Sequence, residues 1–465
     1  MNILLVSPSQ RFVYGENIKP PYPSIGLLMI GAVLLKINHK VKFIDIDADE
    51  INETELIYYL NIFKPDLICL TASTPTFKSA RRIAKIIKKN CQAKVVLGGI
   101  HATVDPENCI GDKNIDFLII GEGEITIKKL VNFLECDRVD FYKIKGLWYK
   151  EGNGVVKGAS RDFIENIDDL PFPAWELVND LKKYHPPGAI HDKVISIMTS
   201  RGCPFNCTFC SAWLIAGKKF RTRSKESVIE EIKYYIEKFD IQEIHIMDDV
   251  FTLEKSRAIE ICQEIQANRW NLILSFANGL RVDSVDDDIL QALKGAGFKD
   301  LGFGVETGDE KILKNIKKGI SKDQVRRAFK LTKKYNFITW GFFIIGLPGE
   351  TEESIWKTID FAIELEPDFA KFLILKPYLG TEVYSELQKM DAIKNFNYDN
   401  YGVYSGPVHD LPDLSSDRMQ LLQRRAYLKF YLRPKKIFQH IKNLKNITQI
   451  KSYLLMIKFA FIKIF

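Results

Sequence analysis

The chain has 465 residues, 46% of them hydrophobic and 27% charged, a composition typical of a folded globular protein with two or three domains. The net charge of +7 is uneven, because residues 418–465 contain twelve Lys or Arg and no Asp or Glu, so the preceding 417 residues sum to −5. A generally basic protein that coats nucleic acid is therefore excluded. Of the eight cysteines, the five outside one short loop show no paired spacing, which favours a reducing cytoplasm over a disulfide framework. The N-terminal residues lack the pattern of a signal peptide, so export is not expected.

Residues 1–135 alternate short apolar runs with helical periods, as expected for a parallel sheet covered on both faces. The pattern predicts five strands, at residues 2–6, 41–45, 66–71, 94–98 and 116–120. It predicts four helices between them, at residues 25–36, 53–63, 77–89 and 125–135. Such a doubly wound, Rossmann-like sheet binds ligands beyond the carboxyl ends of its strands. No Gly-x-Gly-x-x-Gly follows the first strand, which disfavours a dinucleotide site.

The loops at those carboxyl ends carry glycines, which let a backbone approach a ligand closely, and polar side chains that supply hydrogen bonds. The candidate ligand contacts are Ser73, Thr74, Gly98, Gly99, His101, Gly121 and Glu122. In this order the loops resemble the cobalamin-binding domain that precedes many radical S-adenosylmethionine (SAM) domains. Many such domains carry Asp-x-His-x-x-Gly, whose histidine binds the lower face of cobalt, and this chain lacks the motif. We therefore expect a different lower ligand or none. His101 is a candidate contact, although hydrogen bonding to backbone is its simpler interpretation.

Residues 140–190 are predicted to connect two domains, with a hairpin at 146–150 and 154–157 and a proline-punctuated segment at 167–175. A second series of strand–helix units follows, with strands predicted at residues 194–199, 243–247, 272–277, 300–305, 337–345 and 369–375. Six such units predict a partial (β/α)6 barrel of the TIM type, whose chemistry lies where the strands end. The expected α/β chain thus divides into a cobalamin-binding domain, a linker, a barrel and a basic helical C-terminal region, at residues 1–139, 140–190, 191–400 and 401–465.

Three cysteines lie in one loop after the first strand of this second series: Cys203, Cys207 and Cys210. A [4Fe–4S] cluster normally takes four cysteine ligands. The next cysteine, Cys262, is 52 residues away in a helical pattern, so one iron would stay open for a substrate or cofactor. Zinc is the alternative, but it needs a closed set of four ligands. The spacing Cys-x3-Cys-x2-Cys, with Phe209 before the last cysteine, resembles the signature of the radical SAM superfamily.

The resemblance implies that SAM binds the open iron and is cleaved reductively to methionine and a 5′-deoxyadenosyl radical. It also implies residues that hold SAM. Phe209 would lie near the adenine, and Glu306, at the end of the fourth strand, would bind both ribose hydroxyls. Asp248 and Asp249, at the end of the second strand, would accept from the SAM amino group, unless they are simply solvated.

Two further elements are similar to SAM-binding parts of the superfamily. Arg281, after the third strand, would face the SAM carboxylate; the alternative is a structural ion pair with Asp283 or Asp286. The fifth strand ends in a Gly/Pro turn, where Ile344 and Gly346 would present backbone groups to the edge of adenine.

Residues 401–465 fall outside the barrel pattern. The segment 427–436 is basic and aromatic, and 452–465 is mainly apolar but shorter than the roughly 20 residues that cross a bilayer core. A basic amphipathic helix here could lie on an anionic membrane surface, at the inner face of the membrane. A helical cap packed on the barrel is an equal alternative, and RNA binding is a third.

These features predict a cobalamin-dependent radical SAM enzyme that methylates an unactivated carbon of a small or lipophilic metabolite. One alternative is a radical cyclase or rearrangement enzyme acting on a lipid or tetrapyrrole, similar to the anaerobic cyclase of chlorophyll synthesis. Others are an RNA methylthiotransferase, which would need further cluster-spaced cysteines, and a non-catalytic cobalamin or redox sensor. The expected partners are the substrate and a reductant such as flavodoxin or ferredoxin, without nucleic acid.

Overall fold

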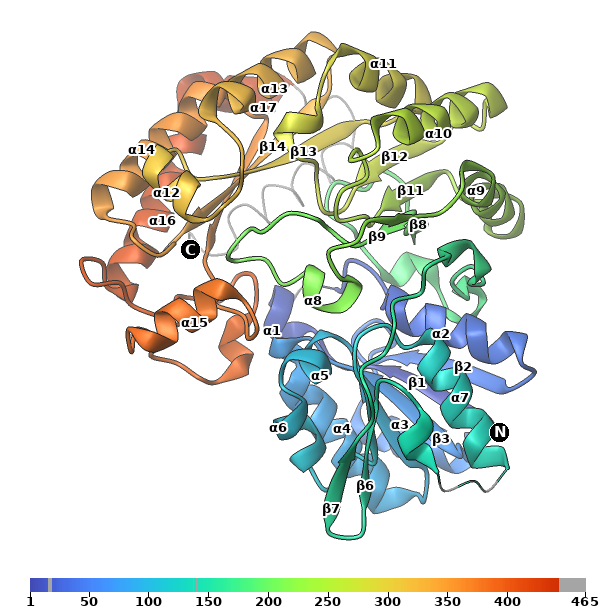
Figure 1. Cartoon of the computed structure of the whole chain (residues 1–465). Coiled ribbons are helices and arrows are strands. Elements are labelled where there is room, and N and C mark those ends of the chain that lie inside the picture. The colour runs from blue at the N-terminus through green and yellow to red at the C-terminus, as the bar shows by residue number, and fades with distance from the viewer. Residues whose placement is uncertain (16–18, 137, 139, 443–465) are drawn as a thin grey trace. The chain divides into compact units, whose positions relative to one another are not determined.

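The structure is a computed structural model that describes residues 1–15, 19–136, 138 and 140–442 (Figure 1). It divides into two compact units. The first comprises residues 1–185, 211–221 and 397–402, and the second comprises residues 186–210, 222–396 and the described residues after 402. The segment predicted as a linker therefore packs largely with the first unit, and two short later segments, residues 211–221 and 397–402, also belong to it. The expected four-part division stays a prediction.

The first unit contains one sheet with the strand order β2-β1-β3-β4-β5-β6-β7. Its first five strands are parallel. They are β1 (Asn2–Ser7), β2 (Lys40–Asp45), β3 (Leu67–Thr71), β4 (Lys94–Gly98) and β5 (Phe117–Ile119). Ile3 to Val6 have no exposed surface, which explains why the strands are continuous apolar runs rather than alternating ones. The order reverses between β1 and β3, where sheets of this type bind their ligands.

The helices of the first unit are α1 (Arg11–Tyr14), α2 (Ile25–Lys36), α3 (Glu53–Phe63), α4 (Phe77–Asn90), α5 (Ile100–Val104), α6 (Pro106–Gly111) and α7 (Glu124–Glu135), with the short α8 (Trp213–Ala216) from the later segment 211–221. The four predicted helices are confirmed to within one residue at each end. α3 begins there because Asn52 and Glu55 form a reciprocal capping box, each side chain accepting from the other's backbone N–H at 3.0 and 2.8 Å. The sequence pattern missed the short helices α5 and α6 after β4.

The predicted hairpin is confirmed as β6 (Leu147–Glu151) and β7 (Gly154–Lys157). β6 pairs antiparallel with β5, placing Tyr149 opposite Phe117 and Trp148 opposite Leu118. The hairpin thus extends the parallel sheet by two antiparallel strands. The sequence pattern predicted the hairpin but not its pairing with β5.

The second unit contains two parallel three-stranded sheets, ordered β12-β11-β8 and β13-β14-β15. The strands are β8 (Val194–Ile197), β11 (Glu243–Ile246), β12 (Ile273–Phe276), β13 (Asp300–Glu306), β14 (Ile338–Ile345) and β15 (Phe369–Ile374). Parallel bridges from Leu274 to Phe298 and from Leu280 to Phe303 join the two sheets into one arc. The predicted six-stranded partial barrel is therefore confirmed.

Helices lie on the outer side of this arc (Figure 1). They are α9 (Lys225–Phe239), α10 (Lys255–Asn268), α11 (Asp287–Ala296), α13 (Lys322–Lys334) and α14 (Glu352–Leu365), while the short helices α12 (Glu310–Asn315) and α15 (Glu382–Lys389) follow β13 and β15 in the chain. The carboxyl ends of the strands consequently face the loops that carry the predicted site residues.

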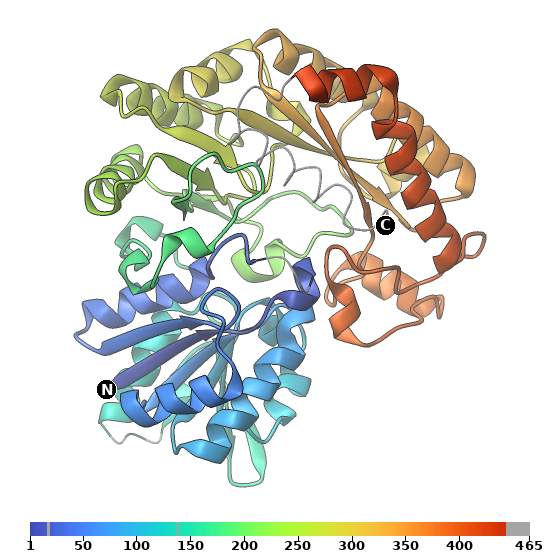
Figure 2. The same ribbon diagram turned by 180° about the vertical axis from the view of Figure 1, so that it is seen from behind.

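The C-terminal helices α16 (Ser416–Tyr431) and α17 (Pro434–Lys442) follow the barrel (Figure 2). α16 covers the edge strand β15. The Tyr431 hydroxyl donates to the Ala370 carbonyl and accepts from its N–H, both at 3.0 Å, and Tyr427 accepts from the Phe372 N–H at 3.2 Å. These hydrogen bonds satisfy backbone N–H and C=O groups of the edge strand β15, which could otherwise pair with a strand of another chain. Residues 416–431 are thus a cap on the barrel, whereas 452–465 lie outside the described residues. No described helix has the length and apolarity to cross a membrane.

Candidate active site

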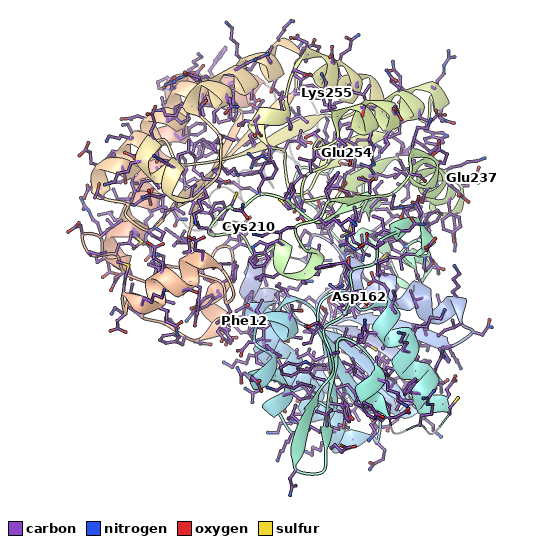
Figure 3. The ribbon with its side chains drawn as sticks, in the orientation of Figure 1. Phe12, Asp162, Cys210, Glu237, Glu254 and Lys255 are labelled. Atoms are coloured by element: carbon purple, nitrogen blue, oxygen red, sulfur yellow. The ribbon has the colours of Figure 1, made fainter. Side chains whose placement is uncertain are left out.

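The three predicted cluster ligands lie in the loop that follows β8, and Cys210 is labelled in Figure 3. Cys203, Cys207 and Cys210 are half-buried free thiols. The Cys207 carbonyl accepts from the Cys210 N–H at 3.1 Å, which closes the turn between them. Burial raises the pKa of Cys203 and Cys207, while the positive charge of Arg281 lowers the pKa of both. The loop therefore presents sulfurs in a partly desolvated place beside a cation that would stabilise their thiolates.

This donor set fits an iron–sulfur cluster better than a single metal ion. Among the described residues, no three His, Cys, Asp or Glu side chains converge on one point. A cluster has no such need, because each cysteine binds a different iron and the ligands stand apart around the cube. Cys262 is fully buried on α10, as the helical pattern predicted. The loop thus offers three ligands and leaves the fourth iron open.

Arg281 lies against the cysteine loop. Its guanidinium carbon is 3.5 Å from the centre of the Phe205 ring, a cation–π contact. Its nitrogens donate to both carboxylate oxygens of Asp283, at 3.0 and 2.8 Å. The ion pair that the sequence left open as an alternative is therefore present, and Arg281 supports the loop. A contact with the SAM carboxylate stays a prediction.

Glu306 ends β13 beside a lysine that sequence reasoning missed. The Lys318 ammonium lies 2.5 Å from Glu306 Oε1 and 5.9 Å from the Phe209 ring centre. Burial lowers the pKa of Lys318, but the charges of Glu306 and Cys207 outweigh it, and the net direction is upward. The positively charged Lys318 therefore interacts both with Glu306, the predicted ribose-binding residue, and with Cys207, a predicted cluster ligand. In the sequence it is one of many lysines in this stretch, so no local signal distinguishes it.

The backbone around Glu306 is specialised for this pair. Glu306 has φ of 66°, an uncommon value for a residue other than glycine, and the register with β14 shifts between Gly304 and Glu306. A Cβ atom on Gly304 would lie 2.7 Å from the Lys318 nitrogen and closer still to the Glu306 carboxylate. The predicted role of the flanking glycines, to clear space, therefore applies at Gly304 to the ion pair.

The two aspartates after β11 have different environments. Asp248 is buried and accepts from the Thr199 N–H at 2.6 Å, the Thr199 hydroxyl at 2.5 Å and the Ser200 hydroxyl at 2.6 Å. It thereby ties β11 to the start of the cysteine loop. Asp249 reaches solvent but is crowded by protein atoms, and burial together with Asp248 raises its pKa to about 6. Of the two, the structure favours Asp249 for the predicted contact with the SAM amino group.

In the turn after β14, backbone groups form hydrogen bonds with protein side chains. The Gly346 N–H donates to Glu350 at 2.7 Å, and its carbonyl lies 2.8 Å from His409 Nε2. Burial raises the pKa of Glu350 to about 8 and lowers that of His409, so both side chains are neutral near pH 7. Gly346 is consequently engaged by residues that the sequence analysis did not single out. Ile344, half-buried, stays the predicted adenine contact.

In the first unit, His101 is enclosed. It has no exposed surface, and its ring lies between Phe77 and Tyr398, with ring centres 4.2 and 4.9 Å away. Its Nδ1 is 3.3 Å from the Thr74 hydroxyl, so the expected backbone partner is replaced by a side chain. Burial lowers the pKa of His101 to about 4, despite Asp105 nearby. In this structure His101 packs within the loop as a buried side chain, and its contact with cobalamin stays a prediction.

Of the other loop candidates, Thr74 is buried, whereas Ser73, Gly98, Gly99 and Gly121 are half-buried at the carboxyl ends of β3, β4 and β5. Ser73 begins a short turn in which its N–H donates to Thr76 at 2.9 Å. Gly98 ends β4, and Gly99 follows it with φ of 93°. A Cβ atom on Gly99 would lie 2.6 Å from the Thr71 hydroxyl oxygen, so a side chain there would collide with β3. The Gly121 N–H, with φ of 74° at that residue, donates to Thr103 at 2.9 Å.

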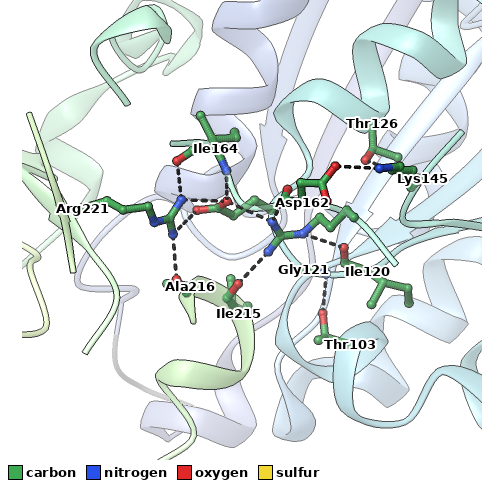
Figure 4. Close-up of polar contacts among 12 residues, drawn as sticks. Thr103, Ile120, Gly121, Thr126, Lys145, Asp162, Ile164, Ile215, Ala216 and Arg221 are labelled. Atoms are coloured by element: carbon green, nitrogen blue, oxygen red, sulfur yellow. Dashed lines mark hydrogen bonds and ion pairs between the residues drawn. The ribbon is translucent and has the colours of Figure 1, made fainter. Parts of the chain in front are cut away.

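Glu122, predicted as a cobalamin contact, is instead the centre of a buried ion network (Figure 4). Its two oxygens lie 2.8 and 3.1 Å from the guanidinium nitrogens of Arg221, and one also lies 3.0 Å from Arg161. The Ile164 N–H donates to the same carboxylate at 3.2 Å. These partners come from the predicted linker and from the segment that follows the cysteine loop. The carboxylate is engaged by two arginines and a backbone N–H, and a contact between Glu122 and cobalamin stays a prediction.

Comparison with known proteins places this geometry in a family. The family model described as the radical SAM superfamily matches residues 197–362, and the B12 binding domain model matches residues 12–131. An uncharacterized methyltransferase of Pyrococcus horikoshii is 37% identical over 95% of this chain and 95% of its own. The chain belongs to the cobalamin-binding radical SAM family. It is a radical SAM enzyme whose cofactors are a [4Fe–4S] cluster, SAM and cobalamin.

More distant relatives of this radical SAM enzyme include cytidylyl-2-hydroxyethylphosphonate methyltransferase of Streptomyces wedmorensis, 26% identical over 83% of this chain and 81% of that protein. The anaerobic magnesium-protoporphyrin IX monomethyl ester cyclase of Cereibacter sphaeroides is 26% identical over 93% of this chain and 71% of that protein. The solved structure of the cobalamin-dependent SAM radical enzyme OxsB has a TM-score of 0.75, with 17% identity, and covers 97% of this chain and 72% of its own. These structural likenesses establish the shared fold.

Proposed function

We propose that this radical SAM enzyme methylates an unactivated carbon of a small or lipophilic metabolite. The observation that carries the proposal is a loop of three cysteines in a chain whose other unit is a cobalamin-type sheet. Relatives named as methyltransferases, from Pyrococcus horikoshii and Streptomyces wedmorensis, extend over most of the chain and support it. When bound, the cluster and SAM supply a carbon-centred radical, and cobalamin supplies a methyl group.

The chain's own residues bind and orient these groups. Cys203, Cys207 and Cys210 would hold three irons of the cluster, and the half-buried Phe209 would lie near the nucleoside of SAM. Glu306 would bind the ribose hydroxyls, with its carboxylate orientation maintained by Lys318 at 2.5 Å. Such a pre-positioned carboxylate lowers the ordering cost of binding.

Other residues hold the cysteine loop in place. Asp248 holds the start of the cysteine loop through Thr199 and Ser200, and Arg281 covers Phe205 within it. These contacts restrict the conformation of the loop. Asp249 is left facing solvent, as a binding group for the SAM ammonium must be.

A radical cyclase is the second candidate, since the likeness to the magnesium-protoporphyrin cyclase covers 93% of this chain. The two functions consume SAM differently. A methylating enzyme would convert one SAM to S-adenosylhomocysteine and a second to 5′-deoxyadenosine and methionine. A cyclase forms 5′-deoxyadenosine without S-adenosylhomocysteine. The proposed electron donor is a flavodoxin or ferredoxin.

The test is anaerobic reconstitution with iron, sulfide and cobalamin, followed by incubation with dithionite and SAM. We expect a corrinoid absorption spectrum and both SAM products. Replacing Cys207 with Ala should abolish 5′-deoxyadenosine formation, whereas replacing the buried Cys262 with Ala should retain it. Formation of 5′-deoxyadenosine without S-adenosylhomocysteine would favour the cyclase, and absence of both with an intact cluster would overturn the proposal.

A further inference from the structure

A basic hollow lies in the second unit, between α12 and α13. Its volume is about 560 Å³, and Lys314, Lys317 and Lys322 line it, together with one acidic residue, Glu310. The surrounding stretch is among the most basic in the chain: residues 311–334 contain ten Lys or Arg and one Asp. Because the chain before the C-terminal tail is acidic overall, this concentration of positive charge is local.

The positive charge of the hollow is only partly neutralised within the protein. Lys317 pairs with Glu382 at 2.6 and 2.9 Å. Lys314 and Lys322 have no carboxylate within ion-pair distance in the described part of the chain, and Lys322 instead lies over the Phe361 ring at 4.7 Å. Burying such lysines against an acidic surface would therefore replace few existing interactions.

A backbone hydrogen bond joins the cysteine loop to the stretch of chain that lines the hollow. The Thr208 N–H, between Cys207 and Phe209, donates to the Ile316 carbonyl at 3.1 Å. Ile316 is followed at once by Lys317 on the wall of the hollow, and by Lys318, whose charge acts on Cys207. One backbone hydrogen bond thus separates the residue next to a cluster ligand from the residue next to this surface. A short route of bonded atoms through protein is what an electron needs to reach a buried cluster.

We propose that the hollow is the docking surface of a small acidic one-electron carrier protein that reduces the cluster. The inference rests on the proposed function, for which each SAM cleavage needs an external electron. One electron leaves the carrier, which is oxidised, and enters the cluster, which is reduced; no bond forms or breaks in this step. Electron-transfer encounters are small and transient, and they rely on complementary charge for rapid association. A locally basic surface on an otherwise acidic chain supplies that complementarity.

The test compares two reductants on the reconstituted holoenzyme. The variant carries Lys314→Glu and Lys322→Glu, which reverse the unpaired charges without touching the cysteine loop or Lys318. The matched control carries Lys85→Glu and Lys89→Glu, two exposed lysines one turn apart on α4. With reduced flavodoxin at low salt, we expect the rate of 5′-deoxyadenosine formation to fall about tenfold in the variant and little in the control. Dithionite is a small reductant that needs no docking surface. With dithionite, the variant and the control should form 5′-deoxyadenosine at the same rate as the parent enzyme.

Binding gives a second readout that does not depend on turnover. The dissociation constant for oxidised flavodoxin, measured by titration without SAM, should rise about tenfold in the variant, and the difference should shrink as added salt screens the charges. If the variant and the control had equal flavodoxin-driven rates and equal dissociation constants for flavodoxin, the proposed docking site would be wrong. Loss of the dithionite-driven reaction in the unmodified enzyme would instead contradict the proposed function. Lys314→Ala with Lys322→Ala should show a smaller loss of the same kind.

Discussion

The buried pair between Glu306 and Lys318 allows a quantitative test of how the site is built. Both side chains are about one-tenth exposed, and their charged atoms are 2.5 Å apart. Glu306→Gln keeps the shape but leaves the Lys318 ammonium buried beside Arg281 without a countercharge. Breaking a buried ion pair on one side typically costs about 3–5 kcal/mol, and because glutamine can still accept one hydrogen bond we expect about 3 kcal/mol of lost stability.

A double-mutant cycle isolates the interaction. Lys318→Met should also destabilise the protein, by leaving a buried carboxylate, but the combined variant should recover about 2 kcal/mol relative to the sum. Urea unfolding under anaerobic conditions measures these changes, with the iron content determined in each sample. The control is Lys317→Met, because its pair with Glu382 is more than half exposed on both sides and should contribute less than about 1 kcal/mol. If Glu306→Gln changed the free energy of unfolding by less than about 0.5 kcal/mol, and the two single effects added up in the double variant, the Glu306–Lys318 ion pair would not stabilise the protein.

Three further predictions concern stability. Replacing Glu122 with Gln should destabilise the protein by about 3 kcal/mol, because Arg161 and Arg221 lose their shared buried countercharge. Tyr431→Phe should cost about 1–2 kcal/mol in urea unfolding, since both polar groups of Ala370 lose their partner. His101 has a pKa of about 4 when folded and about 6.5 when unfolded, so its neutral form stabilises the fold fully above pH 6.5. As pH falls from 6.5 towards 4 that contribution, about 3 kcal/mol, should be lost, and His101→Gln should weaken this part of the pH dependence.

Each of these has a clear contrary outcome. Stability unchanged by Glu122→Gln would mean that water, rather than the carboxylate, compensates the two arginines. A Tyr431→Phe variant as stable as the parent would show that β15 is not held by α16 through this hydroxyl. Parallel pH curves for the parent protein and His101→Gln between pH 6.5 and 4 would contradict a buried neutral histidine.

Local patterns determined much of the architecture. Strands that are buried on both faces must be apolar throughout, so each parallel strand of both units was recognisable as a short apolar run. Helices such as α3 were bounded correctly because capping residues act on their own backbone within a single turn. The cluster ligands were equally readable, since three cysteines in one loop are brought together by chain connectivity alone. The short helices α5 and α6 were missed because they are too brief to establish a helical period.

Side-chain partnerships were decided only by tertiary structure. Glu122 meets Arg221 across 99 positions, and Asp248 meets Thr199 across 49. Sequence reasoning assigned both carboxylates to ligands, because an acidic residue after a strand has the same local signature whether it faces a cofactor or a buried arginine. The choice depends on which loops the sheet order and register bring together. The cysteine spacing thus predicted an iron–sulfur cluster, whereas the packed barrel decided that Lys318 and Arg281 would lie beside the cysteine loop.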